Sequence, residues 1–296
     1  MFEHILGNEK IKNILQESIK QEHTSHSYLF IGIEGIGKQM IAKEFAKILL
    51  CFEKGNCNNS CKSCVEFISD NHPDFLFIEP EGNAIKIEQI RQLQKRIQEK
   101  PIISKKKVYI INDADKMTKE AQNCLLKTLE EPPEFSTIIL IGANENAFLS
   151  TIKSRCMILH FQKIEDKEIK HYLESNLGQT NITENMLNIF QGSIGKAIQL
   201  KDKQELYMQI EEIIENLNTR DLIDVINSSE IIYQSKEEIM EILEYINVIL
   251  IQKAKTNMAF TNCISIVEET KKRIQQNANF DMCIDYLLFN MWEEIN

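Results

Sequence analysis

Short apolar runs alternate with amphipathic helical patterns from Ile5 to about Phe161. Each run has the length of a buried strand, and the segments between the runs carry apolar residues at every third or fourth position. Strands that alternate with helices predict a mostly parallel sheet covered on both faces. We therefore expect an α/β nucleotide-binding core, with strands over residues 27–31, 74–80, 107–112, 136–142 and 157–161.

The helical patterns in this part of the chain have recognisable ends. One pattern covers residues 87–98, with its apolar positions on a single face. Another begins after Thr118, a residue type that caps helix N-termini, and ends before Pro132-Pro133. We expect both segments to be helices that cover the sheet.

After Phe161 the sequence shows no convincing strand. Short helical patterns fill residues 164–202, and longer apolar helices follow from about Gln204. The helix expected over 239–255 is apolar almost all round, which suggests burial against several neighbours or against another subunit. The pattern predicts three units, over residues 1–163, 164–203 and 204–296.

Composition and charge narrow the class of protein. The chain has 296 residues, of which 43% are hydrophobic and 26% charged, as in an ordinary globular protein. Its formal charge of −10 argues against strong nucleic-acid binding by the chain alone, because binding phosphates needs clustered Lys and Arg. The first residues show no signal-peptide pattern, and no apolar stretch approaches the ~20 residues that span a bilayer. We expect a cytoplasmic protein with reduced or metal-bound cysteines.

The stretch "GIEGIGKQ" over residues 32–39 has most features of a phosphate-binding loop. It follows an expected strand and opens an expected helix. Gly32, Gly35 and Gly37 let the backbone N–H groups surround phosphates, and Lys38 is placed to reach the β/γ oxygens. The next residue in such a loop is Ser or Thr, whose hydroxyl binds Mg²⁺, but here it is Gln39.

A second nucleotide element is degenerate in the same way. Working ATPases of this architecture end a strand in Asp-Glu, where Asp helps to bind Mg²⁺ and Glu polarises the attacking water. This chain has Asn112 and Asp113 after its strand. An amide carries no negative charge, and Asp113 is one methylene shorter than Glu. Gln39 and Asn112 therefore weaken one metal site from two sides, which indicates a catalytic centre that no longer hydrolyses ATP.

Four of the eight cysteines fall within fourteen residues, in "CFEKGNCNNSCKSC". This count and compactness are typical of a tetrahedral zinc site, which we favour over free thiols or disulfides. Four thiolates leave the ion no open position, so its role would be structural, holding an insertion over residues 51–64. The predicted ligands are Cys51, Cys57, Cys61 and Cys64.

The chain carries an ordered series of motifs: "ILGN" (5–8), "GIEGIGK" (32–38), the four cysteines, "NHPDFLFIEP" (71–80), "LLKTLEEPP" (125–133), "SRC" (154–156) and "GSIGKA" (192–197). This series resembles the delta-prime subunit family of the bacterial DNA polymerase III clamp loader, AAA+ proteins related to the gamma/tau subunits. The resemblance is firm over the first ~200 residues, whereas the last ~95 match only in being helical. The spacing of the cysteines departs from the family pattern, because the loop between the first two is short.

This resemblance implies an AAA+ core, a small helical lid and an all-α collar domain that holds a five-membered ring together. It also implies that Arg155 of the Ser-Arg-Cys motif is presented to ATP on the adjacent subunit. Without the motif series, an Arg that caps a loop or pairs with a carboxylate would be the simpler interpretation. ATPases of the family carry a sensor arginine where this chain has Gly195, and Asn144 could fill the first sensor position.

The implied function is that of a non-hydrolysing subunit of the polymerase holoenzyme. It would help to load the sliding clamp on primed DNA, with delta and gamma/tau subunits as partners, and would supply Arg155 to a neighbouring ATPase site. The sequence leaves open whether Lys38 still binds ATP. One alternative is a genuine AAA+ ATPase of the gamma/tau type or from replication or repair. A zinc-dependent DNA-binding adaptor is a further alternative, which the net charge disfavours.

Overall fold

The computed structural model describes residues 1–219 and 221–296. The chain forms two compact units. The first contains Met1–Glu168 together with Ser193–Gly195, and the second contains Ile169–Gly192 together with Lys196–Asn296. The division into three units expected from the sequence stays a prediction, and Arg220 in the expected third unit lies outside the described residues.

The first unit is built on a five-stranded sheet in the order β2-β3-β4-β1-β5, with every neighbouring pair parallel. The prediction of an α/β core with a parallel sheet is confirmed. The three central strands are buried along their whole length, which explains their continuous apolar runs. The strands are β1 (Ser27–Ile31), β2 (Phe75–Ile78), β3 (Lys107–Ile111), β4 (Ser136–Gly142) and β5 (Met157–His160).

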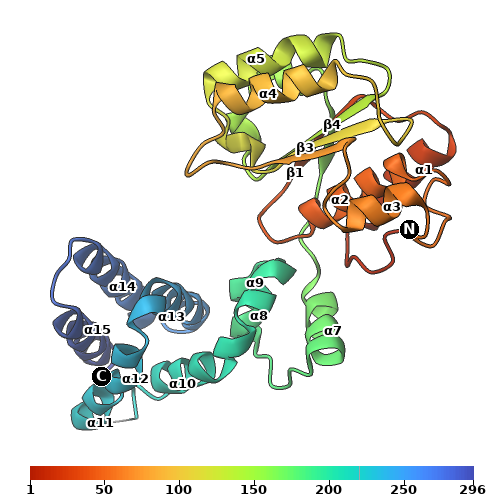
Figure 1. Ribbon diagram of the computed structural model, residues 1–296. Helices are drawn as coiled ribbons and strands as arrows, with labels where there is room; N and C mark the ends of the chain where they lie inside the picture. Colours follow the sequence, from red (N-terminus) through yellow and green to blue (C-terminus); the bar gives the residue numbers. More distant parts are fainter. Residues whose placement is uncertain (220) are drawn as a thin grey trace. The chain divides into compact units, whose positions relative to one another are not determined.

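Helices cover both faces of this sheet, α1 and α2 on one face and α4 and α5 on the other (Figure 1). Alternate strand residues supply the two cores: Phe30 faces the first pair of helices and Leu29 the second. The Thr118 hydroxyl caps α5 by accepting from the Ala121 N–H at 3.2 Å, as expected. The helices of this unit are α1 (Glu9–Lys20), α2 (Lys38–Leu50), α3 (Lys62–Ile68), α4 (Ile87–Ile97), α5 (Lys119–Glu130) and α6 (Ser150–Lys153), with 3₁₀ turns η1 (Ala114–Lys116) and η2 (Glu145–Ala147).

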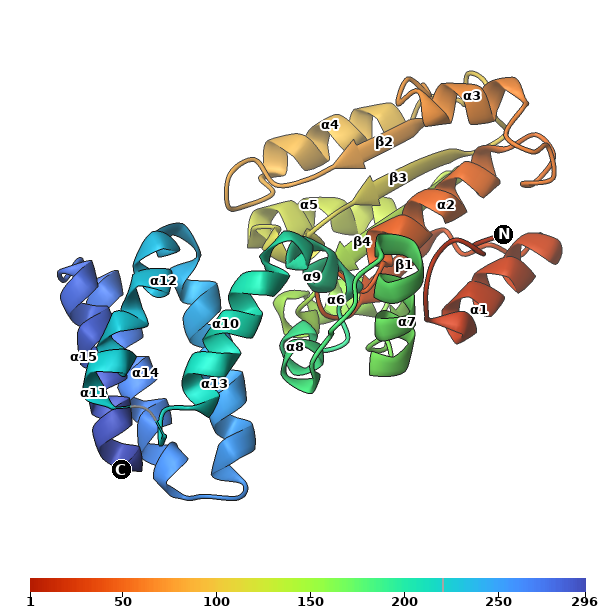
Figure 2. The same ribbon diagram turned by 90° about the horizontal axis from the view of Figure 1, so that it is seen from below.

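The second unit is helical throughout its described residues (Figure 2). Helix α13 packs against α8, α10 and α14, so this apolar helix is covered from several sides. None of the helices described is long and apolar enough to cross a membrane. The helices are α7 (Asp166–Leu177), α8 (Glu184–Phe190), α9 (Ile194–Gln199), α10 (Gln204–Glu215), α11 (Leu222–Asn227), α12 (Ser229–Gln234), α13 (Ile239–Ala254), α14 (Ala259–Gln275) and α15 (Phe280–Ile295), with 3₁₀ turns η3 (Lys201–Lys203) and η4 (Lys236–Glu238).

Glu211 on α10 forms hydrogen bonds with residues of two other helices in this unit. Its carboxylate accepts hydrogen bonds from the Thr183 hydroxyl at 2.9 Å and from the Tyr245 hydroxyl at 2.7 Å. Thr183 caps α8 and Tyr245 lies on α13, so one carboxylate joins three helices. This carboxylate therefore connects α10 with α8 and α13.

Candidate functional site

The glycine-rich loop joins β1 to α2 at the carboxyl edge of the sheet. Gly35 and Gly37 have φ angles of 74° and 88°, a left-handed conformation that side chains with a Cβ rarely adopt. Gly32 is required for a different reason, because a Cβ there would lie 2.7 Å from the Ile36 side chain and 2.9 Å from that of Phe161. The loop thus has the backbone of a phosphate cradle.

The beginning of α9 covers this cradle. The Gly195 N–H donates to the Gly35 carbonyl at 2.8 Å, and a Cβ on Gly195 would lie 2.7 Å from the Gly35 Cα. A Cβ on Gly35 would in turn meet the Ser193 hydroxyl oxygen. The position expected for a sensor arginine is thus a glycine in backbone contact with the loop, and no larger residue fits there without a shift.

Lys38 is buried and turned back onto its own loop. Its ammonium group donates to the carbonyl oxygens of Gly32 at 2.6 Å and Ile33 at 2.7 Å. Burial lowers the pKa of Lys38, and the nearby charges of Glu34, Asp115 and Asp113 oppose that change. The loop carbonyls therefore already bind the ammonium group that a phosphate would need.

The acidic residues after β3 are bound to protein groups. Asp113 has a φ of 47° and its carboxylate pairs with Lys116 at 3.0 Å, which raises the pKa of that lysine. The Asp115 carboxylate accepts from the N–H groups of Ala143 at 3.1 Å and Asn144 at 3.0 Å. The Asn144 side-chain oxygen accepts from Asn146 N–H, so it caps η2. The sequence gave no reason to single out Asp115, since a carboxylate that holds a neighbouring strand end has no local pattern.

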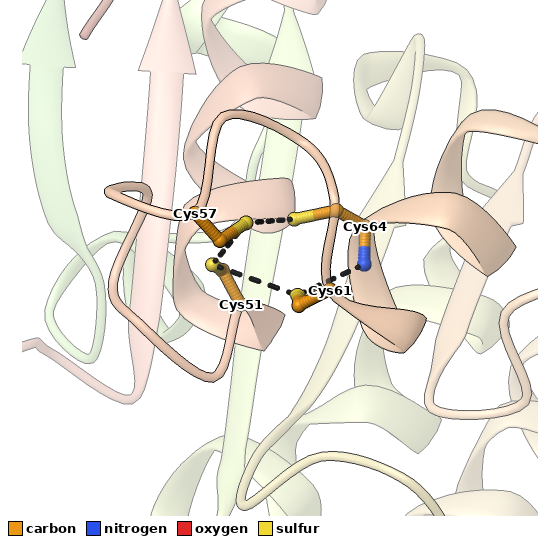
Figure 3. Close-up of side chains that lie close together, drawn as sticks. All are labelled: Cys51, Cys57, Cys61 and Cys64. Carbon is orange, nitrogen blue, oxygen red and sulfur yellow. Dashed lines mark hydrogen bonds between the residues drawn. The ribbon is translucent and has the colours of Figure 1, made fainter.

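The four clustered cysteines converge on one point (Figure 3). Their sulfur atoms all lie within 4.8 Å of one another, with Cys51 Sγ 3.3 Å from Cys57 Sγ and 3.9 Å from Cys61 Sγ. Cys57 Sγ lies 3.5 Å from Cys64 Sγ. A tetrahedral ion with bonds of about 2.3 Å to sulfur separates its ligands by about 3.8 Å, close to these values. The four cysteines could therefore hold a metal ion.

Burial opposes the ionisation of two of these thiols unless a cation lies among them. The backbone N–H of Cys61 lowers the pKa of Cys57 to about 6, whereas burial raises the pKa of Cys51 and of Cys64. Several buried thiolates need a positive charge among them to be stable, and a divalent ion supplies it.

A buried polar network anchors the cysteine module to the sheet. Ser63, between two of the cysteines, donates to the Leu50 carbonyl at 2.8 Å and lies 3.0 Å from His72 Nε2. His72 Nδ1 accepts from the Asp74 N–H at 3.1 Å. The Asp74 carboxylate accepts three backbone N–H groups, those of residues 102–104, at 2.7–2.8 Å. His72 and Asp74 of the "NHPDF" motif are thus structural residues that fix the module.

Arg155 follows α6, and its guanidinium group is bound by neighbouring groups of the same chain. One guanidinium nitrogen donates to the Thr151 carbonyl at 2.9 Å and to the Ser154 hydroxyl at 3.3 Å. The other terminal nitrogen pairs with the Glu130 carboxylate at 2.6 Å. Both features of the simpler interpretation, a loop contact and a carboxylate partner, are present, and sequence reasoning did not identify Glu130.

Arg155 lies at the opposite edge of the sheet from the phosphate loop. It precedes Met157, which pairs with Tyr28 at the start of β1, whereas Gly32 follows the end of β1. At about 3.3 Å per residue the paired strands alone separate the two edges by on the order of 10 Å. Arg155 therefore does not serve the nucleotide loop of its own chain.

Comparison with known proteins identifies the relatives of the chain. A family described as DNA polymerase III, delta subunit, matches residues 7–165. The DNA polymerase III subunit delta' of Bacillus subtilis is 32% identical, with 96% of each chain covered. The tau/gamma subunit of Haemophilus influenzae is 31% identical over 78% of this chain, which spans about a third (35%) of that relative. A solved DNA polymerase III gamma subunit-related protein from Thermotoga maritima has the same fold, with a TM-score of 0.50, 17% identity and coverage of 95% of this chain and 99% of that one.

Proposed function

Since the chain belongs to the DNA polymerase III delta' subunit family, we propose that it is the clamp-loader subunit that does not hydrolyse ATP. It assembles with delta and gamma/tau subunits in the cytoplasm. The complex opens the sliding clamp and closes it on primed DNA. In this assembly the chain supplies Arg155 to the ATP site of a neighbouring subunit.

The chain's own pocket supports the first part of this proposal. Gln39 and Asn112 replace the hydroxyl and the carboxylate that hold Mg²⁺ in a working site. Lys38 is bound to loop carbonyls, and Gly195 stands where a sensor arginine is needed. The loop survives because its backbone connects β1 to α2, whether or not it still holds a phosphate.

The position of Arg155 in the sheet is the single observation that supports its proposed role at a neighbouring ATP site. A guanidinium at the sheet edge opposite its own phosphate loop can reach a nucleotide only on another subunit. Arginines supplied in this way stabilise the charge that develops on the γ-phosphate, and are worth roughly 10³–10⁵ in rate at the site they serve.

We also propose that the metal of the cysteine cluster is zinc. Four thiolates at tetrahedral spacing are typical of structural zinc sites, and they leave no ligand position for a substrate. The ion would hold Cys51 at the end of α2 against Cys64 on α3.

Replacing Arg155 tests the function. Arg155→Ala removes the guanidinium but little buried structure, so we expect normal assembly with delta and gamma/tau and a lower DNA-stimulated ATPase rate. The measurement is steady-state ATP turnover of the reconstituted complex. Arg91→Ala, at an exposed arginine on α4, is the matched control and should change nothing. Unchanged turnover with Arg155→Ala would remove the residue from the mechanism.

An active ATPase of the gamma/tau type is the second candidate, favoured by the 31% identity to the Haemophilus relative. It requires turnover by the purified chain. A rate above ~0.1 s⁻¹, near the low end of ordinary enzymes, that Lys38→Ala abolishes would support it over the delta' assignment.

A further inference from the structure

Two motifs of the sequence meet at one ion pair. Glu130 is the last residue of α5, which ends there because Pro132 and Pro133 follow. Arg155 comes 25 residues later, two residues after the end of α6. Their side chains approach to 2.6 Å, so the Glu of "LEEPP" binds the Arg of "SRC".

The contacts fix the guanidinium without using all its donors. A guanidinium carries five N–H groups. Three are used by the bonds to the Thr151 carbonyl, the Ser154 hydroxyl and the Glu130 carboxylate. Because the carbonyl and the carboxylate hold different terminal nitrogens, they set the plane of the group as well as its position. The remaining donors are enough to bind a phosphate oxygen.

Scaffold contacts hold both partners in place. The Gln122 amide on α5 donates to the Ala147 carbonyl at 2.9 Å, and its oxygen accepts from the Leu149 N–H at 2.9 Å. These bonds join α5 to the segment that leads into α6. Glu130 and Arg155 are thus the ends of two elements that are fixed to each other nearby.

The solvent exposure of the Arg155–Glu130 pair limits its contribution to folding stability. Arg155 and Glu130 are 32% and 47% exposed, and exposed ion pairs contribute only about 0–1 kcal/mol to stability. The pair is therefore a weak candidate for a stabilising element. A subunit interface that excludes water would strengthen the same interaction, because its effective dielectric constant is lower.

We propose that Glu130 is the positioning residue for Arg155, holding the guanidinium at the angle from which it meets a nucleotide on the neighbouring subunit. This role rests on the proposed function of Arg155 and adds to it a residue that touches no nucleotide. The acceptor oxygen of Glu130 and its location set the orientation of the guanidinium.

The test uses three substitutions in the reconstituted complex. Glu130→Ala removes the acceptor, so the DNA-stimulated kcat at the site served by Arg155 should fall about threefold to tenfold, with KM for ATP changed less than about twofold. Glu130→Gln keeps an acceptor oxygen at the same distance and should restore the rate. Glu130→Asp keeps the charge but withdraws the acceptor, and should behave like Glu130→Ala. Glu131→Ala, at the next residue along the chain, is the matched control.

A double-mutant cycle separates positioning from a general structural effect. In an Arg155→Ala background, Glu130→Ala should cause no further loss. Additive losses, or a full rate with both Glu130→Ala and Glu130→Asp, would overturn the positioning role. If Arg155→Ala itself leaves the rate unchanged, the proposed function fails instead, so the two failures are distinguishable. Thermal unfolding of each variant should match that of the native chain.

Discussion

At the scale of single residues, His72 shows how burial couples a side chain to pH. The ring is buried, and burial lowers its pKa, while the negative charges of Asp74 and Glu66 act in the opposite direction. Its Nδ1 accepts from the Asp74 backbone, so the neutral ring is the form that fits. Protonation therefore opposes the network that holds Ser63 and the cysteine module.

The sign of the resulting pH dependence follows from this shift. Between the lowered pKa of the folded state and about 6.5 in the unfolded chain, the unfolded state binds more protons. We expect the contribution of His72 to stability to be complete above pH 6.5 and to be lost as the pH falls below it, with a slope of up to about 1.4 kcal/mol per pH unit. Urea unfolding from pH 5 to 7.5 measures it.

His72→Asn provides the comparison, because an amide keeps hydrogen-bonding groups but does not titrate here. Its unfolding free energy should depend less steeply on pH than that of the native chain. Equal slopes in the two proteins would show that another group is responsible.

The predictability of the site residues differs with the range of their contacts. Gln39, Asn112 and the four cysteines could be identified from sequence because local spacing defines their chemistry. Glu130 and Asp115 could not be identified from sequence, since their partners lie 25 and 28 or more residues away. Only the tertiary fold brings these partners together. The need for glycine at position 195 could not be predicted either, because it depends on close backbone contact with Gly35.

At the scale of elements, the cysteine module gives a direct prediction. Cys61→Ser should lose the metal and loosen residues 51–68, because structural zinc contributes on the order of 10 kcal/mol to the folding of such modules. Metal analysis should find one zinc per native chain, and hydrogen exchange should quicken over the module in the variant. Cys124→Ser is the control, since Cys124 donates to Gln94 away from the cluster. Less than one ion per native chain would count against the site.

The first turn of α9 gives another prediction at this scale. Gly195→Ala would bring a Cβ to 2.7 Å from the Gly35 Cα, so either the turn or the loop must move. We expect a loss of about 1–3 kcal/mol, as for overpacked sites, seen as a lower thermal unfolding midpoint. Gln199→Ala, at an exposed position later in α9, should stay within about 0.5 kcal/mol. A Gly195→Ala protein as stable as the native chain would contradict the close contact.

The elements themselves were largely predictable. All five strands lie within the ranges that their apolar runs predicted, because buried parallel strands have continuous hydrophobic sequences. The grouping of the helices after β5 was not readable from periodicity. It depends on contacts such as Glu211 with Thr183 and Tyr245, which join segments 28 and 34 residues apart.

At the scale of the whole molecule, the chain combines an α/β core with a helical unit and matches a delta' subunit over 96% of its length. Lys38 of its own nucleotide loop is bound to a loop carbonyl, and Arg155 lies at the opposite edge of the sheet. Under the proposed function, this chain completes an ATP site that another subunit carries.

The most direct test compares Lys38→Ala and Arg155→Ala side by side in the complex reconstituted with delta and gamma/tau subunits. The measurement is DNA-stimulated ATP turnover at saturating ATP. The account predicts that Lys38→Ala leaves the rate unchanged, while Arg155→Ala removes at least the share contributed by the site it serves. A rate that falls with Lys38→Ala and persists with Arg155→Ala would contradict it.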